Sequence, residues 1–208
     1  MDWRALLRRC PTRSMTIVGD VGQTHSAAGI SSWEESLGAV FGRDRWQLET
    51  LSINYRTPEA IMVEAERRAV AAGVEVTGTL AARDVAGAYA VRAGEDLLAA
   101  ALAEAKCLIG DDGETSAGRL ALIASEAAIE GLRRAVEASP LAALASGPTL
   151  LDSRLAVLTP VEVKGLEFDD VIVLDPDSIT ASGPTGPRDL YVAMTRPTRR
   201  LRMIVPVG

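Results

Sequence analysis

LAVLTPVEVKGLEFDDVIVL, residues 155–174, contains two short apolar runs separated by a segment rich in charged residues. Runs of this kind are typical of strands that are covered on both faces. Further apolar runs at residues 120–124 and 202–205 alternate with helical patterns along the chain. Because strands that alternate with helices indicate a parallel sheet, the sequence predicts the α/β fold class.

Capping residues mark the expected helix boundaries. Ser31 and Glu34 have the spacing of a capping box, and Thr57-Pro58 places an N-cap residue before a proline at the first helical position. Gly73 is expected to end the helix that begins there. We also expect strands at residues 15–18 and 46–51, helices at residues 96–109 and 127–138, and exposed loops at residues 110–118 and 182–187.

The composition limits the classes of function. The 208 residues are 48% apolar, enough for one domain or one and a part. The net charge of −6 argues against a surface devoted to neutralising phosphates, so any nucleic-acid contact must be local. Cys10 and Cys107 lie far apart without further ligands at metal spacing, so neither a disulfide framework nor a metal site is predicted. The chain shows no membrane span and no signal peptide, so we expect a cytoplasmic protein without a membrane partner.

Four stretches carry the candidate chemistry, and the first is GDVGQ, residues 19–23. It follows the expected strand at residues 15–18 and would place Asp20 and Gln23 at the carboxyl edge of the sheet, where such sheets bind ligands. Taken alone, the stretch is better explained as an ordinary turn, and only the stretches that follow favour a site.

The second stretch is LSINYRTP, residues 51–58, in which an aromatic residue and an arginine directly precede a helix. The Tyr55 ring can stack on a base, and the Arg56 guanidinium offers a planar fork to phosphate oxygens. The structural alternative is that Tyr55 packs under the sheet and Arg56 caps a carbonyl.

The third stretch is LTPVEVKGLEFD, residues 158–169, between two expected strands. Gly165 stands between Lys164 and Glu167, so the backbone could approach a ligand closely while both charge signs are presented to it.

The fourth stretch is RDLYVAMTR, residues 188–196, a helical pattern that ends before Pro197. Because proline disfavours continuing a helix, Arg196 is expected to project from the helix end, where it could reach a phosphate across a cleft. A solvated cation at a helix end is the alternative.

Together, and in this order, the four stretches resemble motifs III to VI of the UvrD/Rep/PcrA class of superfamily 1 helicases. The resemblance spans about residues 14–205, although residues 75–151 match only in overall character. It implies a RecA-like three-layer α/β/α sandwich with a mainly parallel sheet, the fold of the P-loop NTPases. Residues 1–50 would be the remnant of a first motor domain, packed on the second domain or on a neighbouring molecule. Residues 51–208 would be the second motor domain, and residues 51–54 the hinge.

In that family ATP binds in the cleft between the two motor domains, and its hydrolysis opens and closes the cleft. The motif match implies that Gln23 senses the γ-phosphate and its attacking water, and that Asp20 helps to hold that turn. It implies that Arg56 and Arg196 contact the γ-phosphate as arginine fingers, a role that can be worth roughly 10³ to 10⁵ in rate.

The remaining matches concern the base, the sugar and the coupling to nucleic acid. Tyr55 would stack on adenine and Glu167 would bind the ribose. The turn at Lys164 and Gly165 would couple the nucleotide state to the nucleic-acid track, which Thr159 would contact.

The departures from the family pattern concern phosphate and metal binding first. The sequence has no Gly-x-x-x-x-Gly-Lys-Ser/Thr loop, and the acidic pair that holds Mg²⁺ is missing upstream of Gly19. ATP and Mg²⁺ are therefore expected as ligands of a full-length parent whose N-terminal motor domain completes the site. The chain by itself is expected not to hydrolyse ATP.

Other departures concern nucleic-acid contacts. Val161 stands where typical members have a DNA-contacting histidine, and the nearest candidate for a base-stacking aromatic is Trp33, for which core packing is the alternative. The sole histidine, His25, is expected to be a solvated loop residue. With the acidic balance and the short spacing between Arg56 and Thr159, these features are closest to the HelD-like branch, whose members bind and release RNA polymerase.

The main hypothesis is an ATP-driven translocase that acts on single-stranded DNA, on RNA polymerase or on both. Two other interpretations of the sequence stay open. The first is a non-catalytic RecA-like module that docks a protein partner. The second is an unrelated doubly wound domain, which would have to explain all four stretches as coincidence.

Overall fold

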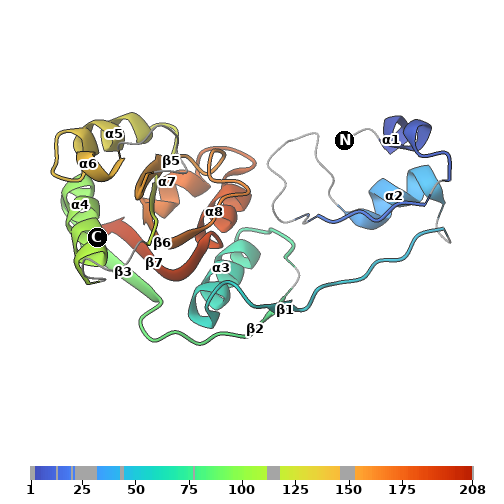
Figure 1. Cartoon of the computed structure of the whole chain (residues 1–208), viewed down its shortest axis with the longest axis horizontal. Helices are drawn as coiled ribbons and strands as arrows, with labels where there is room; N and C mark the ends of the chain where they lie inside the picture. Colours follow the sequence, from blue (N-terminus) through green and yellow to red (C-terminus); the bar gives the residue numbers. More distant parts are fainter. Residues whose placement is uncertain are drawn as a thin grey trace.

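A parallel five-stranded sheet is the core of the larger, carboxy-terminal part of the chain (Figure 1). The structure is a computed structural model that describes residues 3–12, 14–19, 21, 32–42, 45–76, 78–111, 118–145 and 153–207. The strand order is β3 (Tyr89–Gly94), β7 (Pro197–Pro206), β6 (Phe168–Leu174), β4 (Leu120–Ile123) and β5 (Leu155–Leu158), and every neighbouring pair is parallel. The predicted α/β class with a mainly parallel sheet is confirmed.

Helices cover both faces of the sheet, which makes three layers. One face is covered by α4 (Leu97–Asp111), α5 (Ile129–Glu137) and α6 (Ala142–Ala145), and the other by α3 (Glu59–Ala71), α7 (Pro176–Thr180) and α8 (Gly186–Met194) (Figure 1). Successive residues of β6 point to opposite faces, as the strand period of two requires. Val171 and Val173 pack with α3 and α8, whereas Ile172 and Leu174 pack with α4 and α5.

The boundaries of the helices differ from the predictions in small ways that have local causes. Pro58 is itself the N-cap of α3, so the helix begins at Glu59 rather than at the proline. Gly73 has φ +75° and follows the end of α3, as expected of a residue that terminates a helix. Ser32 caps α2 (Trp33–Phe41) by accepting a hydrogen bond from the Glu35 N–H, and Ser31, the predicted cap, lies outside the described residues.

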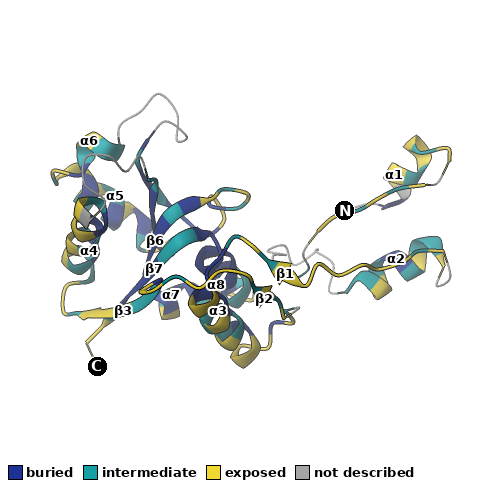
Figure 2. Cartoon of the chain, turned by 60° about the horizontal axis from the view of Figure 1, so that its bottom comes forward, coloured by how far each residue is buried: buried dark blue, intermediate teal, exposed yellow. Residues whose placement is uncertain are grey.

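Residues before the sheet domain form a small helical unit and a ribbon. Helices α1 (Trp3–Arg9) and α2 contact each other, and the Trp3 indole N–H donates to Ser36 Oγ at 3.0 Å. Both helices lie apart from the sheet in two views (Figures 1 and 2), and the described residues of this segment do not show the expected packing on the second domain. Strands β1 (Ile53–Asn54) and β2 (Leu80–Ala81) pair with each other as a short parallel ribbon beside α3.

The strands predicted at residues 15–18 and 46–51 are wrong. The described residues of both segments are irregular. Their apolar side chains lack a neighbouring strand to cover them, since Val18 is 87% exposed and Leu51 is 83% exposed. The division of the chain at residues 50 and 51 stays a prediction. Among the described residues, no helix is both long and apolar enough to cross a membrane.

Candidate functional site

Three of the four candidate stretches meet at the amino ends of strands β6 and β7. Arg56 Nη1 donates to Glu167 Oε1 at 2.6 Å, and Arg56 Nη2 donates to the carbonyl oxygen of Thr195 at 3.3 Å. Glu167 directly precedes the first residue of β6, and Thr195 lies two residues before the first residue of β7. These partners lie 111 and 139 residues from Arg56 along the chain, so the fold alone brings them together.

The backbone of Arg56 is held by two side chains that the sequence analysis missed. Asn54 Oδ1 accepts hydrogen bonds from the Arg56 N–H at 2.9 Å and from the Thr57 N–H at 3.1 Å, which forms an Asx turn. Arg83 Nη1 donates to the Arg56 carbonyl and to the Thr198 carbonyl, both at 2.9 Å. The main chain of Arg56 is therefore fixed to the start of β7, while its side chain stays 36% exposed.

The segment that leads to Glu167 crosses from the carboxyl end of β5 to the amino end of β6, and a capping box fixes its start. Thr159 N–H donates to Glu162 Oε2 at 2.8 Å, and the Glu162 N–H donates to Thr159 Oγ1 at 3.3 Å, which is the reciprocal pattern of a capping box. Gly165 has φ +74°, a conformation that favours glycine. The Glu167 side chain is 55% exposed beside this turn.

The carboxylate of Glu162 and the ammonium of Lys164 have shifted pKa values in the same turn. Burial raises the pKa of Glu162, but the hydrogen bonds from Thr159 and the charge of Arg133 outweigh it, so the pKa is lowered. Burial lowers the pKa of Lys164; the negative charge of Asp189 opposes the fall and the positive charge of Arg196 deepens it.

Arg196 does not project from the helix end, and this prediction is wrong. Arg196 is only 3% exposed. Its Nε donates to the Val192 carbonyl at 3.0 Å, and its Nη2 donates to Thr195 Oγ1 at 3.3 Å. Helix α8 ends at Met194, and only two residues connect it to the start of β7 at Pro197. That short connection carries Arg196 into the interior along α8 instead of outward.

Tyr55 and Thr159 lie in contrasting environments. The Tyr55 side chain is 70% exposed, so the alternative that it packs under the sheet is wrong and its ring is available to a ligand. Thr159 is 3% exposed and follows β5 at the carboxyl edge of the sheet, the edge opposite to Arg56 and Glu167. Val161, on the same turn as Thr159, is 46% exposed.

The first stretch is only partly visible. Asp20, Gln23 and His25 lie outside the described residues, so their expected roles stay predictions. Trp33 is half-buried, and a Cβ on Gly19 would lie 3.0 Å from its ring, which shows close packing of the ring against the Gly19 backbone. That contact favours the packing alternative for Trp33.

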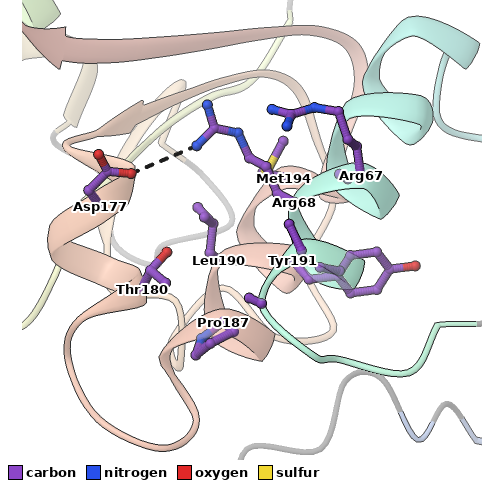
Figure 3. A pocket seen from close by; sticks show the side chains of 12 residues that line it. Arg67, Arg68, Asp177, Thr180, Pro187, Leu190, Tyr191 and Met194 are labelled. Carbon is purple, nitrogen blue, oxygen red and sulfur yellow. Dashed lines mark ion pairs between the residues drawn. The ribbon is translucent and has the colours of Figure 1, made fainter.

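A surface groove that the sequence analysis did not anticipate lies among α3, α7 and α8 (Figure 3). It has a volume of about 430 Å³, and Ala65, Ala69 and Ala72 line it at helical spacing, a pattern of small residues that could have signalled it. Arg68 lies 3.9 Å from Asp177 across it. None of Arg56, Glu167 and Arg196 lines this groove.

Glu64, next to the groove on α3, is the described carboxylate with the largest resolved pKa shift. Hydrogen bonds from Arg67 lower its pKa most, burial acts in the opposite direction, and Arg68 lowers it further, to about 2. The three distances from these arginines to the carboxylate oxygens are all 2.7 Å.

The described residues offer no cluster of metal ligands. No group of three histidine, cysteine or carboxylate side chains that could hold a metal ion occurs in the described ranges. Cys10 and Cys107 are both free thiols. The described residues therefore offer no cluster of ligands for Mg²⁺.

The architecture is consistent with the RecA-like three-layer α/β/α fold, with a parallel sheet between two helical layers. No protein-family model matches the chain, and no curated protein matches its sequence. Among solved structures, it is similar to the C-terminal domain of a possible DNA helicase from Lactobacillus plantarum WCFS1. The two are 19% identical, the match covers 74% of this chain and 88% of that chain, and the TM-score is 0.48. At this level the likeness does not identify a function.

Proposed function

We propose that the chain is the carboxy-terminal part of an ATP-dependent superfamily 1 helicase or translocase, with residues 51–208 as its second RecA-like motor domain. In this proposal Arg56 contacts the γ-phosphate of ATP, Tyr55 stacks on the adenine and Glu167 binds the ribose. The observation that carries the proposal is the contact of Arg56 with Glu167 and with the Thr195 carbonyl at one edge of the sheet. Residues from three expected nucleotide-binding motifs thus meet in one place.

The present pairing of Arg56 is compatible with exchange onto a phosphate. The side chains of Arg56 and Glu167 are 36% and 55% exposed, and an ion pair this exposed contributes about 0–1 kcal/mol. A phosphate offers the guanidinium two oxygens and more negative charge than one carboxylate. Exchanging Glu167 for a phosphate as the partner of Arg56 would therefore cost little free energy. The Glu167 carboxylate would then be available to a sugar hydroxyl.

Arg196 is assigned to a later step of the same cycle. Its guanidinium is buried and donates to the Val192 carbonyl, so it would reach a phosphate only after leaving that contact. We propose that this happens when the cleft between the two motor domains closes on the nucleotide.

The rest of the ATP site is assigned to a first motor domain. The phosphate-binding loop and the carboxylates that hold Mg²⁺ are absent from this chain, and Asp20 and Gln23 would belong to the tail of that domain. The chain alone is accordingly proposed to be inactive as an ATPase.

RNA polymerase is the partner that we favour. At the carboxyl edge, the exposed Val161 has no polar group to offer a nucleic-acid strand, and the net charge of −6 gives no general attraction to phosphates. These features fit a HelD-like protein that acts on a polymerase complex better than a strand-unwinding enzyme. Single-stranded DNA is the alternative partner.

One observation favours a second candidate, a docking module without ATP turnover. Both proposed finger arginines already have protein partners, since Arg56 pairs with Glu167 and Arg196 donates to Val192. A scaffold domain would keep such pairs for stability alone.

ATPase assays on the full-length parent separate the two candidates. We expect Arg56→Ala to lower kcat by roughly 10³-fold or more and Arg196→Ala to lower it as well, because each would remove a finger. Arg67→Ala is the matched control: Arg67 also pairs with one carboxylate, is 61% exposed, and should leave turnover unchanged. Turnover that survives Arg56→Ala at the level of the Arg67→Ala control would exclude the finger role. An unaltered parent without any turnover would favour the docking module. Stimulation of the unaltered protein by RNA polymerase or by single-stranded DNA would identify the partner.

A further inference from the structure

Strand β7 begins with a β-bulge next to the candidate site. Two steps along β6, from Phe168 to Asp170, are matched by three steps along β7, from Pro197 to Arg200. One extra residue is therefore inserted in β7 at the amino edge of the sheet. Bulges are rare between parallel strands and are often found beside functional sites, where they redirect a side chain. This bulge interrupts strand pairing at the edge where Arg56 binds its partners.

The carboxylate of Asp170 holds the bulge from the β6 side. Its Oδ2 accepts a hydrogen bond from Arg199 Nη2 at 2.7 Å, and its two oxygens accept from Arg200 Nε at 2.7 Å and Arg200 Nη2 at 2.9 Å. Successive side chains of a regular strand point to opposite faces, so the bulge allows Arg199 and Arg200 to share one carboxylate. The Asp170 side chain is 5% exposed, and a charge buried this deeply needs such partners.

The same bulge presents a carbonyl oxygen to the residue that holds Arg56. Thr198 lies within the bulge and, among the described strands, has no paired residue in the ladder between β6 and β7. Its carbonyl oxygen accepts a hydrogen bond from Arg83 Nη1, and the same nitrogen donates to the Arg56 carbonyl, both at 2.9 Å. A continuous series of contacts therefore runs from Asp170 through the bulge to the main chain of Arg56.

We propose that Asp170 is a positioning residue for Arg56. Its carboxylate keeps the bulge of β7 in place, and the bulge fixes the Thr198 carbonyl to which Arg83 binds. Without the shared carboxylate between them, the two guanidinium groups would repel each other and the bulge would open. The consequence for turnover rests on the proposed function, in which Arg56 contacts the γ-phosphate. The placement of Arg56 itself does not depend on that function.

Arginine side-chain NMR on the 208-residue chain follows the relevant guanidinium groups directly. Arg56→Lys and Arg83→Lys identify the Nε–H signals of these two residues. In Asp170→Asn we expect both signals to shift, because the Thr198 carbonyl moves away from Arg83. We also expect the Nη protons of Arg83 to exchange with water faster, because one of their acceptors is lost.

Glu104→Gln is the matched control. Glu104 is also a largely buried carboxylate shared by two arginines, since Arg202 Nε donates to it at 2.9 Å and Arg92 Nε at 3.3 Å. Both of these arginines lie outside the bulge. Glu104→Gln therefore removes an equivalent buried charge from the same domain, and it should leave the two arginine signals where they are in the unaltered chain.

The comparison separates positioning from a general loss of structure. If Asp170 only stabilised the fold, losing either buried carboxylate would have the same effect on the two arginine signals. Equal shifts in both variants, or unchanged signals in a folded Asp170→Asn chain, would overturn the proposal. If Asp170→Asn does not fold, Arg199→Gln replaces it as the test: this side chain is 32% exposed, and its loss leaves Asp170 paired with Arg200. Unchanged signals in Arg199→Gln would then overturn the proposal.

ATPase measurements on the parent test the consequence for turnover separately. We expect Asp170→Asn to lower kcat by roughly 10- to 100-fold with little change in KM, because small misplacements of reacting groups cost that much. Glu104→Gln should leave both constants unchanged. If the arginine signals behave as expected and the unaltered parent has no ATPase activity, the proposed function fails and the positioning role stands. If the signals do not, the positioning role fails whatever the ATPase result.

Discussion

Gly186, the first residue of α8, tests how closely this helix sits against α7. A Cβ at this position would lie 2.3 Å from the carbonyl oxygen of Thr180 and 2.5 Å from that of Ile179. Ordinary contact begins near 3.4 Å, and both neighbours are main-chain atoms that cannot rotate away. An alanine here would therefore force the two helices apart by about 1 Å, since close-packed interiors have no room to absorb the methyl group.

The size of the effect follows from two opposing contributions. Overpacking costs about 1–3 kcal/mol, and contact with two carbonyl oxygens places Gly186→Ala at the upper end of that range. The better helix propensity of alanine offsets up to about 1 kcal/mol. We expect the free energy of unfolding to fall by about 2 kcal/mol. A displaced α8 should also shift the Thr195 carbonyl away from Arg56.

Equilibrium denaturation in urea measures the change, and the chain provides its own control. Gly131 lies inside α5 with nothing within 4 Å of its missing Cβ, so Gly131→Ala is expected to stabilise by about 0.5–1 kcal/mol. The two identical substitutions should therefore have opposite signs. A Gly186→Ala chain as stable as the Gly131→Ala chain would refute the close contact between α8 and α7.

Two further predictions concern carboxylates. The pKa of Glu64 is lowered from 4.5 to about 2, so its pairing, chiefly with Arg67, stabilises the fold above pH 4.5 and is lost as the pH falls toward 2. Because Arg67 is 61% exposed, solvent reduces this contribution to about 1 kcal/mol. Unfolding free energies measured between pH 4.5 and pH 2 should show the loss in the unaltered chain and not in Glu64→Gln. Equal dependence of the unfolding free energy on pH in the two chains would contradict the pairing. Glu162→Ala removes the acceptor of the Thr159 N–H and should cost about 1 kcal/mol, a fall of about 2–4 °C in Tm. Glu130→Ala, at an exposed carboxylate, should change Tm less, and a larger fall there would argue against the capping box.

The sequence predicted the sheet well where strands are buried on both faces. The apolar runs at residues 120–124, 155–158, 171–174 and 202–205 all became strands, because continuous apolar character is itself a sign of double coverage. The equally apolar run at residues 15–18 did not, since a strand also needs a neighbour to accept its hydrogen bonds. Pattern alone cannot reveal whether that neighbour exists.

The sequence predicted which residues belong to the candidate site, but not how their side chains are placed and buried. Arg56 and Glu167 were both expected in one nucleotide site, and the fold places them in contact. The depth of Arg196 depends on the two-residue link between α8 and β7, which residue types do not specify. Arg83 was missed because its role depends on a group from a distant segment, the Thr198 carbonyl.

The pairing of β3 with β7 has a consequence for how the protein is made. Tyr89 pairs with Leu201 and Gly94 with Pro206, so the first strand of the sheet cannot pair until the last strand has been made. All the other helices and strands of the sheet after β3 are translated between them. Closing so long a loop is slow, and an unpaired strand edge is prone to aggregate in the meantime. The nascent domain should therefore stay incomplete, and a suitable client for chaperones, until residues 197–206 have left the ribosome.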